Sequence, residues 1–307
     1  MTDLPGLDTF VHLARSGSIS ATARTLGVPR STVTRRLARL EESVGEPLLE
    51  RTTRSLRLTE AGQLLAKRGG ALVRELRTLH EEVASIGGSP RGLLRVSLPP
   101  GLGGPFMPLF LREFRSRFPD IRFEQDVREH PPHLLDDHFD IVLTPGPLAD
   151  SPWRQHKVSR LQHIAVASPD YLEQRGTPAQ PDELPEHDCL AVRSHQHGTD
   201  SWPLRGGGQQ TIRPLLISND LNTIRQAALA GLGIALLPFH LCFEDFQNGS
   251  LVVVLPERVG RTETLYALVT PERRRSPLIR AVLDSMDAFS QAVPAPVKAG
   301  QETASTA

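Results

Sequence analysis

The feature that most constrains this chain is a series of short helical segments between residues 7 and 62, separated by glycines. The first segment has apolar residues at helical spacing, namely Leu7, Phe10, Val11 and Ala14. Ser18 is a suitable N-cap for a second helix, which Gly27 ends. A third helix is predicted from about Ser31 to Val44. Two short helices joined by a tight turn that contains glycine predict a helix-turn-helix.

The third helix has two dissimilar faces. One is a narrow apolar stripe made of Val33, Leu37, Leu40 and Val44. The other carries short polar residues and arginines. Short side chains let a helix backbone approach the base edges in the major groove, and arginine supplies a bidentate donor for guanine or phosphate. The alternative is that the arginines form only a solvated face, but the segment that follows is basic as well.

That segment reads EPLLERTTRSLRLTEAG, and Arg51, Arg54 and Arg57 recur in it at every third residue. Such spacing suits a short β-ribbon, or wing, lying along the DNA backbone or minor groove. Thr59 is a plausible cap for another helix. We therefore predict double-stranded DNA as a partner, bound through Ser18, Arg30, Ser31, Thr32, Thr34, Arg35, Arg36, Arg51 and Arg54.

These segments resemble the DNA-binding domain of the LysR-type transcriptional regulators, without gaps over about fifty residues. The matching residues are Phe10, Leu13, Ala14, Gly17, Ser18, Ala23, Leu26, Gly27, Val28, Val33, Arg35, Leu40, Glu41, Gly45, Pro47, Leu48, Arg51, Arg54, Leu58, Thr59, Ala61 and Gly62. The resemblance implies a sequence-specific regulator, not an enzyme, that assembles as a homodimer or, more often, a homotetramer. The chain departs from the family at Pro29 and Arg30, where a helix cap and a base-reading glutamine are usual. Arg30 predicts a preference for guanine over adenine.

From Thr59 to Ile86 the sequence predicts one long helix. Its apolar residues step by four and three positions, as Leu72, Leu76, Leu79, Val83 and Ile86. The helix either packs on its own domain or pairs with a second copy, and the resemblance favours pairing. The segment GGSPRG, residues 87–92, breaks the helix and is expected to act as a hinge.

Charge and composition limit the class of protein. The chain has 307 residues and no net charge, yet residues 1–68 contain eleven Arg or Lys against seven Asp or Glu. A basic end on a mildly acidic body suits a protein that holds a polyanion at one end. No apolar run approaches the roughly 18 residues of a membrane span, and we see no signal peptide. Cys189 and Cys242 give no disulfide framework, so a reducing cytoplasm is expected.

After the hinge, strands and helices alternate in two sets, which predicts α/β architecture with mostly parallel sheets and a cleft between two lobes. This arrangement resembles the family's effector-binding domain, which is similar to periplasmic solute-binding proteins. We divide the chain into a winged helix-turn-helix (1–60), a linker helix and hinge (61–90), a two-lobed effector-binding domain (91–293) and a disordered tail (294–307).

Ligands of open α/β sheets sit beyond the carboxyl ends of the strands. That rule, with the resemblance, predicts an effector site formed by Pro100, Gly101, Leu102, Arg128, His130, Thr144, Ser194, His195, Asp220, Leu221 and Asn222. Arg128 and His130 suit a carboxylate or phosphate. Pro99 and Pro100 stand where the family often has small or hydroxyl-bearing residues, so the ligand's class stays open.

Other chemistry finds little support. GLGG at 101–104 lacks the spacing of a nucleotide-binding loop, and no hydrolase or metalloprotease motif occurs. The stretch HPPHLLDDH (130–138) reads as a polar loop and helix rather than a metal site, so no metal or other cofactor is expected. Cys242 is expected to be a small buried residue, whereas redox sensing by Cys189 would need an accessible thiolate. Arg273, Arg274 and Arg275 are expected to form a solvated turn.

Two rival functions remain open. One is a solute-binding or transport-associated protein, which the arginine-bearing N-terminal helices disfavour. The other is an architectural DNA-binding protein without a ligand, which the two-lobed body disfavours. The favoured prediction is a transcriptional regulator whose DNA binding is modulated by a small-molecule effector held between the lobes.

Overall fold

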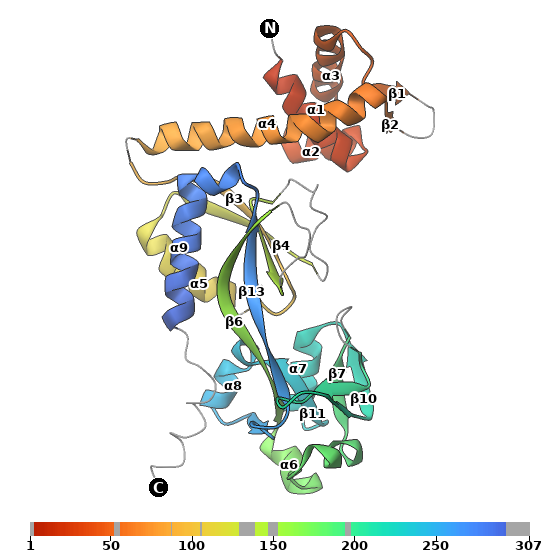
Figure 1. The fold of residues 1–307 in the computed structure, drawn as a ribbon, viewed down its shortest axis with the longest axis vertical. Helices are drawn as coiled ribbons and strands as arrows, with labels where there is room; N and C mark the ends of the chain where they lie inside the picture. Colours follow the sequence, from red (N-terminus) through yellow and green to blue (C-terminus); the bar gives the residue numbers. More distant parts are fainter. Residues whose placement is uncertain are drawn as a thin grey trace.

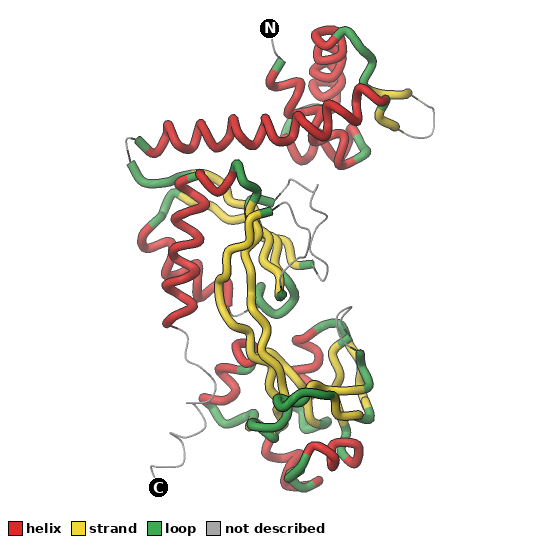
Figure 2. The backbone as a smooth tube through the Cα atoms, in the orientation of Figure 1, coloured by secondary structure: helices red, strands yellow, loops and turns green. Residues whose placement is uncertain are grey.

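The computed structural model describes residues 3–51, 56–86, 88–104, 106–128, 139–146, 153–193 and 198–292. A small helical head, one long helix and a larger two-lobed α/β body follow one another along the chain (Figure 1). The head consists of α1 (Leu4–Ser16), α2 (Ile19–Leu26), α3 (Arg30–Val44), β1 (Leu49–Arg51) and β2 (Leu56–Leu58). Helix α4 (Glu60–Ser85) starts in the head and extends across one end of the body (Figures 1 and 2).

Glycines end the three head helices, as the sequence predicts for Gly27. Gly17, Gly27 and Gly45 follow α1, α2 and α3, and each has the left-handed backbone that residues other than glycine rarely adopt. Helix α3 begins at Arg30, one residue earlier than predicted, because Pro29 takes the N-cap position without a side-chain hydrogen bond. The predicted apolar stripe of α3 is confirmed for Val33, Leu37 and Leu40, which lie in the core of the head.

The wing is tied closely to the helices. Glu41 of α3 accepts hydrogen bonds from the backbone amides of Leu48 and Leu49, at 2.8 and 3.2 Å. Strands β1 and β2 then pair as an antiparallel hairpin. Thr59 caps α4 by accepting a hydrogen bond from the amide of Gly62 at 3.0 Å. These contacts fix the position of the wing relative to α3.

Gly62 is required at the point where α4 crosses the strand of the wing. A Cβ atom at this position would lie 2.2 Å from the backbone oxygen of Leu48. We expect Gly62→Ala to lower the free energy of unfolding of the head by about 1–3 kcal/mol, because backbone atoms must shift to relieve the overlap. Urea titration monitored by far-ultraviolet circular dichroism measures this loss. Gly206→Ala is the control, since a Cβ there meets no atom within 4 Å.

A single sheet of nine strands runs through both lobes of the body. Its order is β10-β7-β11-β6-β13-β5-β3-β4, with β12 also paired to β6. Its strands are β3 (Gly92–Leu98), β4 (Ile121–Val127), β5 (Ile141–Pro145), β6 (Arg154–Ala167), β7 (Cys189–Val192), β10 (Pro214–Ser218), β11 (Ile234–Pro238), β12 (Val252–Val254) and β13 (Gly260–Val269). Lobe I holds β3, β4 and β5, and lobe II holds β7, β10, β11 and β12. A small hairpin, β8 (Ser201–Pro203) with β9 (Gln209–Thr211), lies beside lobe II.

The predicted parallel pairing is confirmed within each lobe, where β3 pairs with β4 and β5, and β7 pairs with β10 and β11. Strands β6 and β13 differ from the expectation of two mostly parallel sheets. They pair antiparallel along their length and run from one lobe into the other (Figure 1). The lobes therefore share one continuous sheet.

Helices cover the sheet. Lobe I carries α5 (Phe106–Arg117) and α9 (Pro277–Ala292), whose Phe110, Phe114 and Ile279 join its core. The helices of lobe II are α6 (Pro169–Arg175), η1 (Pro181–Glu186), α7 (Leu221–Leu229), η2 (Phe239–Leu241) and α8 (Phe243–Gln247), and η3 (Arg273–Arg275) precedes α9. Strand β7 is buried on both faces, since Cys189 and Leu190 belong to different cores.

Three smaller features of the described residues concern the cysteines, membrane spans and metal ligands, and the arginine turn. Cys189 and Cys242 are both buried free thiols, and burial raises the pKa of each to about 12, so Cys189 is not an accessible thiolate. Among the described residues no helix is long and apolar enough to cross a membrane, and no three candidate ligands gather to hold a metal. The prediction of a solvated arginine turn is wrong for Arg273, which is only 1% exposed because it packs against α4 and α9.

Candidate functional site

Helix α3 presents a polar, basic face to solvent. Arg30, Ser31, Thr34 and Arg35 are exposed, and Thr32 is half-buried. By helical spacing, Ser31 and Arg35 project from the side of α3 opposite the buried Val33, whereas Arg30 lies in the first turn of the helix. The described part of the chain thus contains a helix whose leading face combines short side chains with long guanidinium groups, as entry into a major groove requires.

Some predicted DNA contacts are placed elsewhere. Arg36 is half-buried, and its Nη1 donates to Thr9 Oγ1 of α1 at 3.3 Å, so it lies on the flank that packs against the head. Ser18 is half-buried and caps α2, with its hydroxyl accepting from the amide of Ala21 at 3.4 Å. Arg54 and the side chain of Arg51 lie outside the described residues.

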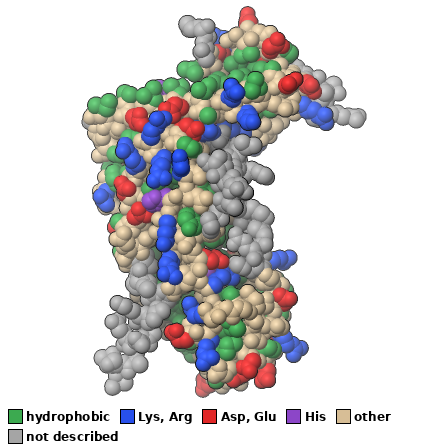
Figure 3. All heavy atoms as spheres, in the orientation of Figure 1, with side chains coloured by type: hydrophobic (Ala, Val, Ile, Leu, Met, Phe, Trp, Pro, Cys, Tyr) green, Lys and Arg blue, Asp and Glu red, His purple; other side chains and the backbone are tan. Residues whose placement is uncertain are grey.

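The second half of α4 carries an exposed apolar stripe. Of the five residues of the predicted seam, Leu72, Leu79, Val83 and Ile86 are 51–85% exposed, while Leu76 is half-buried. Hydrophobic side chains gather along the edge of the molecule over α4 (Figure 3). The opposite side of the same helix, with Arg77, Thr78 and Glu81, contacts lobe I through polar groups. The apolar seam of α4 is therefore left uncovered in a single chain.

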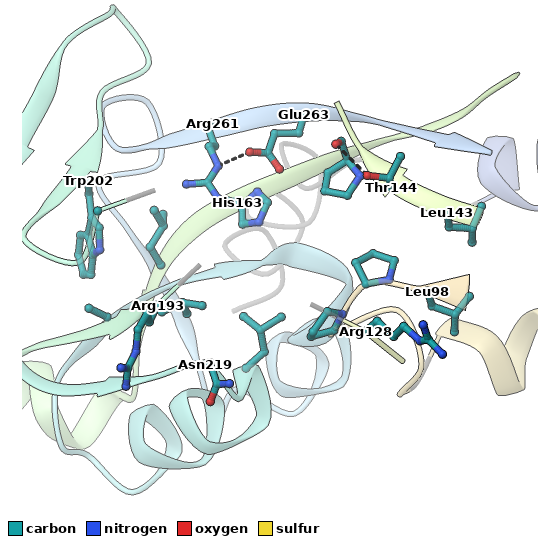
Figure 4. Close-up of a pocket in the computed structure, with 18 of the residues that line it drawn as sticks. Leu98, Arg128, Leu143, Thr144, His163, Arg193, Trp202, Asn219, Arg261 and Glu263 are labelled. Atoms are coloured by element: carbon teal, nitrogen blue, oxygen red, sulfur yellow. Dashed lines mark hydrogen bonds and ion pairs between the residues drawn. The ribbon is translucent and has the colours of Figure 1, made fainter. Parts of the chain in front are cut away.

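A cavity of about 160 Å³ lies between the lobes. One end is lined by residues at and just beyond the carboxyl ends of the strands of lobe I, and Trp202 of lobe II lies at the other end (Figure 4). The antiparallel strands contribute His163, Arg261 and Glu263 along one wall. Arg193 and Asn219, which follow β7 and β10, lie along the opposite wall. A space of this volume is about large enough for a ligand the size of benzene.

Three arginines give this cavity a positive character. Arg261 is held by Glu263 through an Nε–Oε1 contact of 2.7 Å, and burial lowers the pKa of Arg261 despite the nearby carboxylate. Arg128 pairs with Asp126 at 2.6 Å and lies over the ring of Phe139. The guanidinium of Arg193, in contrast, has no hydrogen bond or ion pair with any residue that the structure describes. Among the described residues it is the cavity-lining arginine without a carboxylate partner, and it is exposed to solvent.

The predicted effector residues divide into four groups. Pro100, Arg128, Thr144 and Leu221 line the inter-lobe cavity. Gly101, Asp220 and Asn222 line a second cavity instead. Leu102 lines neither, because its side chain is 1% exposed and packs into the core of lobe I. His130, Ser194 and His195 lie outside the described residues.

The second cavity, of about 630 Å³, lies between α5, α7, α8 and α9. Its walls are mainly apolar, and Pro100 and Leu221 separate it from the inter-lobe cavity because they line both. His240 contacts the backbone oxygen of Gly101 at 3.2 Å, and burial lowers its pKa, which favours the neutral imidazole. Asp220 acts as the N-cap of α7, and hydrogen bonds from Thr223 and Asn222 lower its pKa. Although larger, this cavity has fewer converging polar groups than the inter-lobe cavity.

Several residues that line the inter-lobe cavity were not predicted by the rule that places ligands at strand ends. His163, Arg261 and Glu263 lie in the middle of β6 and β13, whereas the rule searches only the carboxyl ends of parallel strands. Trp202 lies on the short hairpin strand β8. One signal was available: Arg261 and Glu263 are charged residues at alternate positions of a strand, so both project from one face.

Comparisons with known proteins agree with this architecture. The family model of bacterial regulatory helix-turn-helix proteins of the lysR family matches residues 4–63, and that of the LysR substrate binding domain matches residues 87–290. An HTH-type transcriptional regulator of Xanthomonas campestris pv. campestris is 32% identical over 288 residues, 92% of this chain and 84% of that protein.

Two solved structures are similar over nearly their whole length. CrgA, a LysR-type transcriptional regulator from Neisseria meningitidis, is 29% identical with a TM-score of 0.61, covering 93% of this chain and 98% of that one. The Vibrio cholerae virulence activator AphB, a member of the same family, is 28% identical with a TM-score of 0.60, covering 94% of this chain and 99% of that one. With its helix-turn-helix head, long α4 and two-lobed α/β body, the chain belongs to the LysR family of DNA-binding bacterial transcriptional regulators and carries that family's effector-binding domain.

Proposed function

We propose that two copies of the chain pair through the apolar stripe of α4 and so hold two heads at a fixed spacing. The stripe defined by Leu72, Leu79, Val83 and Ile86 follows a heptad pattern, which suits a partner helix rather than solvent. Paired heads would place two copies of α3 in major grooves about one helical turn of DNA apart. A tetramer would arise from two such pairs through a further contact.

Within each head, Arg30, Ser31, Thr34 and Arg35 are proposed to face the bases. Their exposure on one side of α3 supports this assignment, whereas Arg36 is proposed to hold α1 instead. Helix α3 lacks a side-chain N-cap, so its first amide groups are suited to bind a DNA phosphate. Such a regulator works where bacterial DNA lies, in the cytoplasm.

The effector is proposed to be a small anion bound between the lobes. The observation that carries this proposal is Arg193, a cationic side chain on the cavity wall with no counter-ion among the described residues. Arg128 and Arg261 already have carboxylate partners at 2.6 and 2.7 Å. A carboxylate or phosphate on the ligand would complete the charge balance, with Asn219, Thr144 and Ser201 as further hydrogen-bonding groups.

Tryptophan fluorescence tests this site directly. The chain has two tryptophans, and Trp202 lines the cavity while Trp153 is buried in a separate cluster. A Trp153→Phe background therefore reports on Trp202 alone. We expect one or more members of a panel of small carboxylates and phosphates to change this fluorescence saturably. In that background Arg193→Gln is expected to raise the Kd about tenfold to a hundredfold, as loss of a charged hydrogen bond of about 1.5–3 kcal/mol implies.

The matched control is Arg213→Gln, which removes an exposed arginine of lobe II that does not line the cavity. It is expected to leave the Kd unchanged. Equal affinities in the Arg193 and Arg213 variants would place the anion elsewhere. Saturable binding of neutral compounds alone would remove the anion from the proposal and draw attention to the larger apolar cavity.

A further inference from the structure

Helix α4 has two opposed faces, and the polar one packs on the body. Its apolar stripe points away from lobe I, while Arg77, Thr78 and Glu81 lie on the side that contacts it. An amphipathic helix normally buries its apolar face against its own domain. Here the contact between the linker helix and the effector-binding domain is made of ion pairs and hydrogen bonds. Hydrophobic burial therefore does not explain why α4 packs on lobe I at this position.

At its centre lies Arg273, the buried arginine that follows β13. Its Nη1 donates to Glu81 Oε2 of α4 at 2.7 Å, and its Nη2 lies 3.0 Å from Asp140 Oδ1 of lobe I. Thr78, 1% exposed, donates to the backbone oxygen of Glu272 at 3.4 Å. We call Thr78, Glu81, Asp140 and Arg273 the linker joint. It connects residues that are up to 195 positions apart in the chain.

The charges around the linker joint balance. Four arginines face four carboxylates, in the pairs formed by Arg74, Arg77, Arg273 and Arg275 with Glu75, Glu81, Asp140 and Glu272. Ser276 adds a short hydrogen bond to Glu81. Among the described residues, the Nε and Nη2 atoms of Arg273 find no hydrogen-bond partner, and Nη2 makes only an ion pair with Asp140. Buried ion pairs add little stability over apolar contacts but define one relative orientation.

Two strands run from the linker joint to the inter-lobe cavity. Asp140 directly precedes β5, whose Thr144 and Pro145 line the cavity. Arg273 follows β13, whose Arg261 and Glu263 line the same cavity. Strands β5 and β13 are hydrogen-bonded to each other, and about 20 Å of β13 separates Glu263 from Val269 at the usual rise per residue. A relative movement of the lobes at the cavity therefore acts on both Arg273 and its partner Asp140.

We infer that Arg273 is a positioning residue: by joining Glu81 of the linker helix to Asp140 of lobe I, it sets the angle of α4 on the effector-binding domain and conveys the state of the inter-lobe cavity to the DNA-binding head. This inference rests on the proposed function, in which a ligand between the lobes modulates DNA binding. Apolar packing would hold α4 across a range of angles, whereas the Arg273–Glu81 hydrogen bond, together with the Arg273–Asp140 ion pair, holds one angle.

Because coupling between two binding sites is reciprocal, DNA is a sufficient probe while the effector is unidentified. Hydrogen–deuterium exchange is measured on the full-length protein with and without the duplex from upstream of its own gene, at low salt. In the wild type, DNA is expected to change exchange at least about threefold in two regions, α4 residues 75–85 and the cavity-lining β5. In Arg273→Gln, exchange of residues 75–85 rises about tenfold without DNA, and the DNA-dependent change at β5 is lost.

Arg274→Gln is the matched control, since Arg274 is the next residue and is exposed. It should behave as the wild type, and Arg273→Lys should restore part of the coupling. Glu81→Gln breaks the linker joint from the α4 side, which keeps the test valid if the buried arginine is needed for folding of the body.

The possible outcomes distinguish a failure of the proposed function from a failure of the role inferred for the linker joint. A wild type that does not bind the duplex contradicts the proposed function. A wild type that binds it but shows no change at β5, or an Arg273→Gln protein that retains the full change, overturns the role of the linker joint.

Discussion

A full-length chain that carries Leu79→Glu and Val83→Glu is expected to bind DNA with two half-sites at least about a hundredfold more weakly than the wild type. Both side chains are more than half exposed on α4, so the substitutions cost little within one chain. In a pair of chains, however, they place four carboxylates in an apolar seam, where unpaired charges are strongly unfavourable. Linking two heads raises the affinity for DNA with two half-sites by about 10²–10⁴, and loss of pairing removes this increase.

Sedimentation velocity and fluorescence anisotropy measure the two consequences in one preparation. His80→Glu with Ala84→Glu is the matched control, because both positions are exposed on the same helix but lie off the apolar stripe. The control should keep the wild-type mass and affinity. If the stripe variant also keeps its assembly mass, the stripe does not form the interface that links the heads.

Replacing Arg30 and Arg35 together by alanine is expected to reduce discrimination between operator and scrambled DNA at least about thirtyfold. Each arginine that contacts a guanine contributes about 1–3 kcal/mol of specificity. Both are exposed on α3, Arg30 in its first turn and Arg35 on the face opposite the buried stripe. Competition anisotropy across a salt series measures the effect. Lost base contacts lower the affinity ratio, whereas lost phosphate contacts lower the slope of affinity against salt.

Arg36→Ala serves as the comparison within the same helix. Its guanidinium donates to Thr9 at 3.3 Å, so the substitution should affect the stability of the head more than the choice of sequence. An unchanged ratio in the double variant would remove Arg30 and Arg35 from base recognition. A reduced ratio in Arg36→Ala would mean that this arginine leaves Thr9 when DNA binds.

The head could be predicted from sequence because its signals are local. Gly17, Gly27 and Gly45 end helices by a backbone conformation that needs no tertiary contact. The apolar stripe of α3 likewise follows from residues only a few positions apart. The contact of Arg36 with Thr9 could not be predicted, because Thr9 is 27 residues away and helical spacing alone puts Arg36 on the edge of the exposed face.

The inter-lobe cavity was predictable only in part. Pro100, Arg128, Thr144 and Leu221 lie at or just beyond the ends of strands, so a rule about strand ends finds them. Arg261 and Glu263 line the cavity only because β13 crosses between the lobes and pairs antiparallel with β6. The register of that pairing depends on contacts between residues about a hundred positions apart. Leu102 shows the converse error, since proximity to a strand end does not determine whether a side chain faces the cavity or the core.

Arg273 shows that burial cannot always be predicted from neighbouring residues in the sequence. Three consecutive arginines in a Pro-rich loop resemble a solvated turn, and two of them are indeed exposed. The buried one is distinguished by carboxylates that come from α4 and from the start of β5, far away in the sequence. Only the tertiary fold brings those groups to a single point.

The shared strands of the sheet also make the second lobe an insertion. Gln162 of β6 lies opposite Thr262 of β13, so the chain leaves the first lobe and returns to it at neighbouring positions. An inserted segment whose two ends meet about 5 Å apart can be exchanged as a cassette, because its replacement leaves the host strands in register. Evolution can thereby replace the second lobe, which supplies Arg193, Trp202 and Asn219 to the cavity. Such a replacement changes the ligand that is bound and leaves the DNA sequence that the head recognises unchanged.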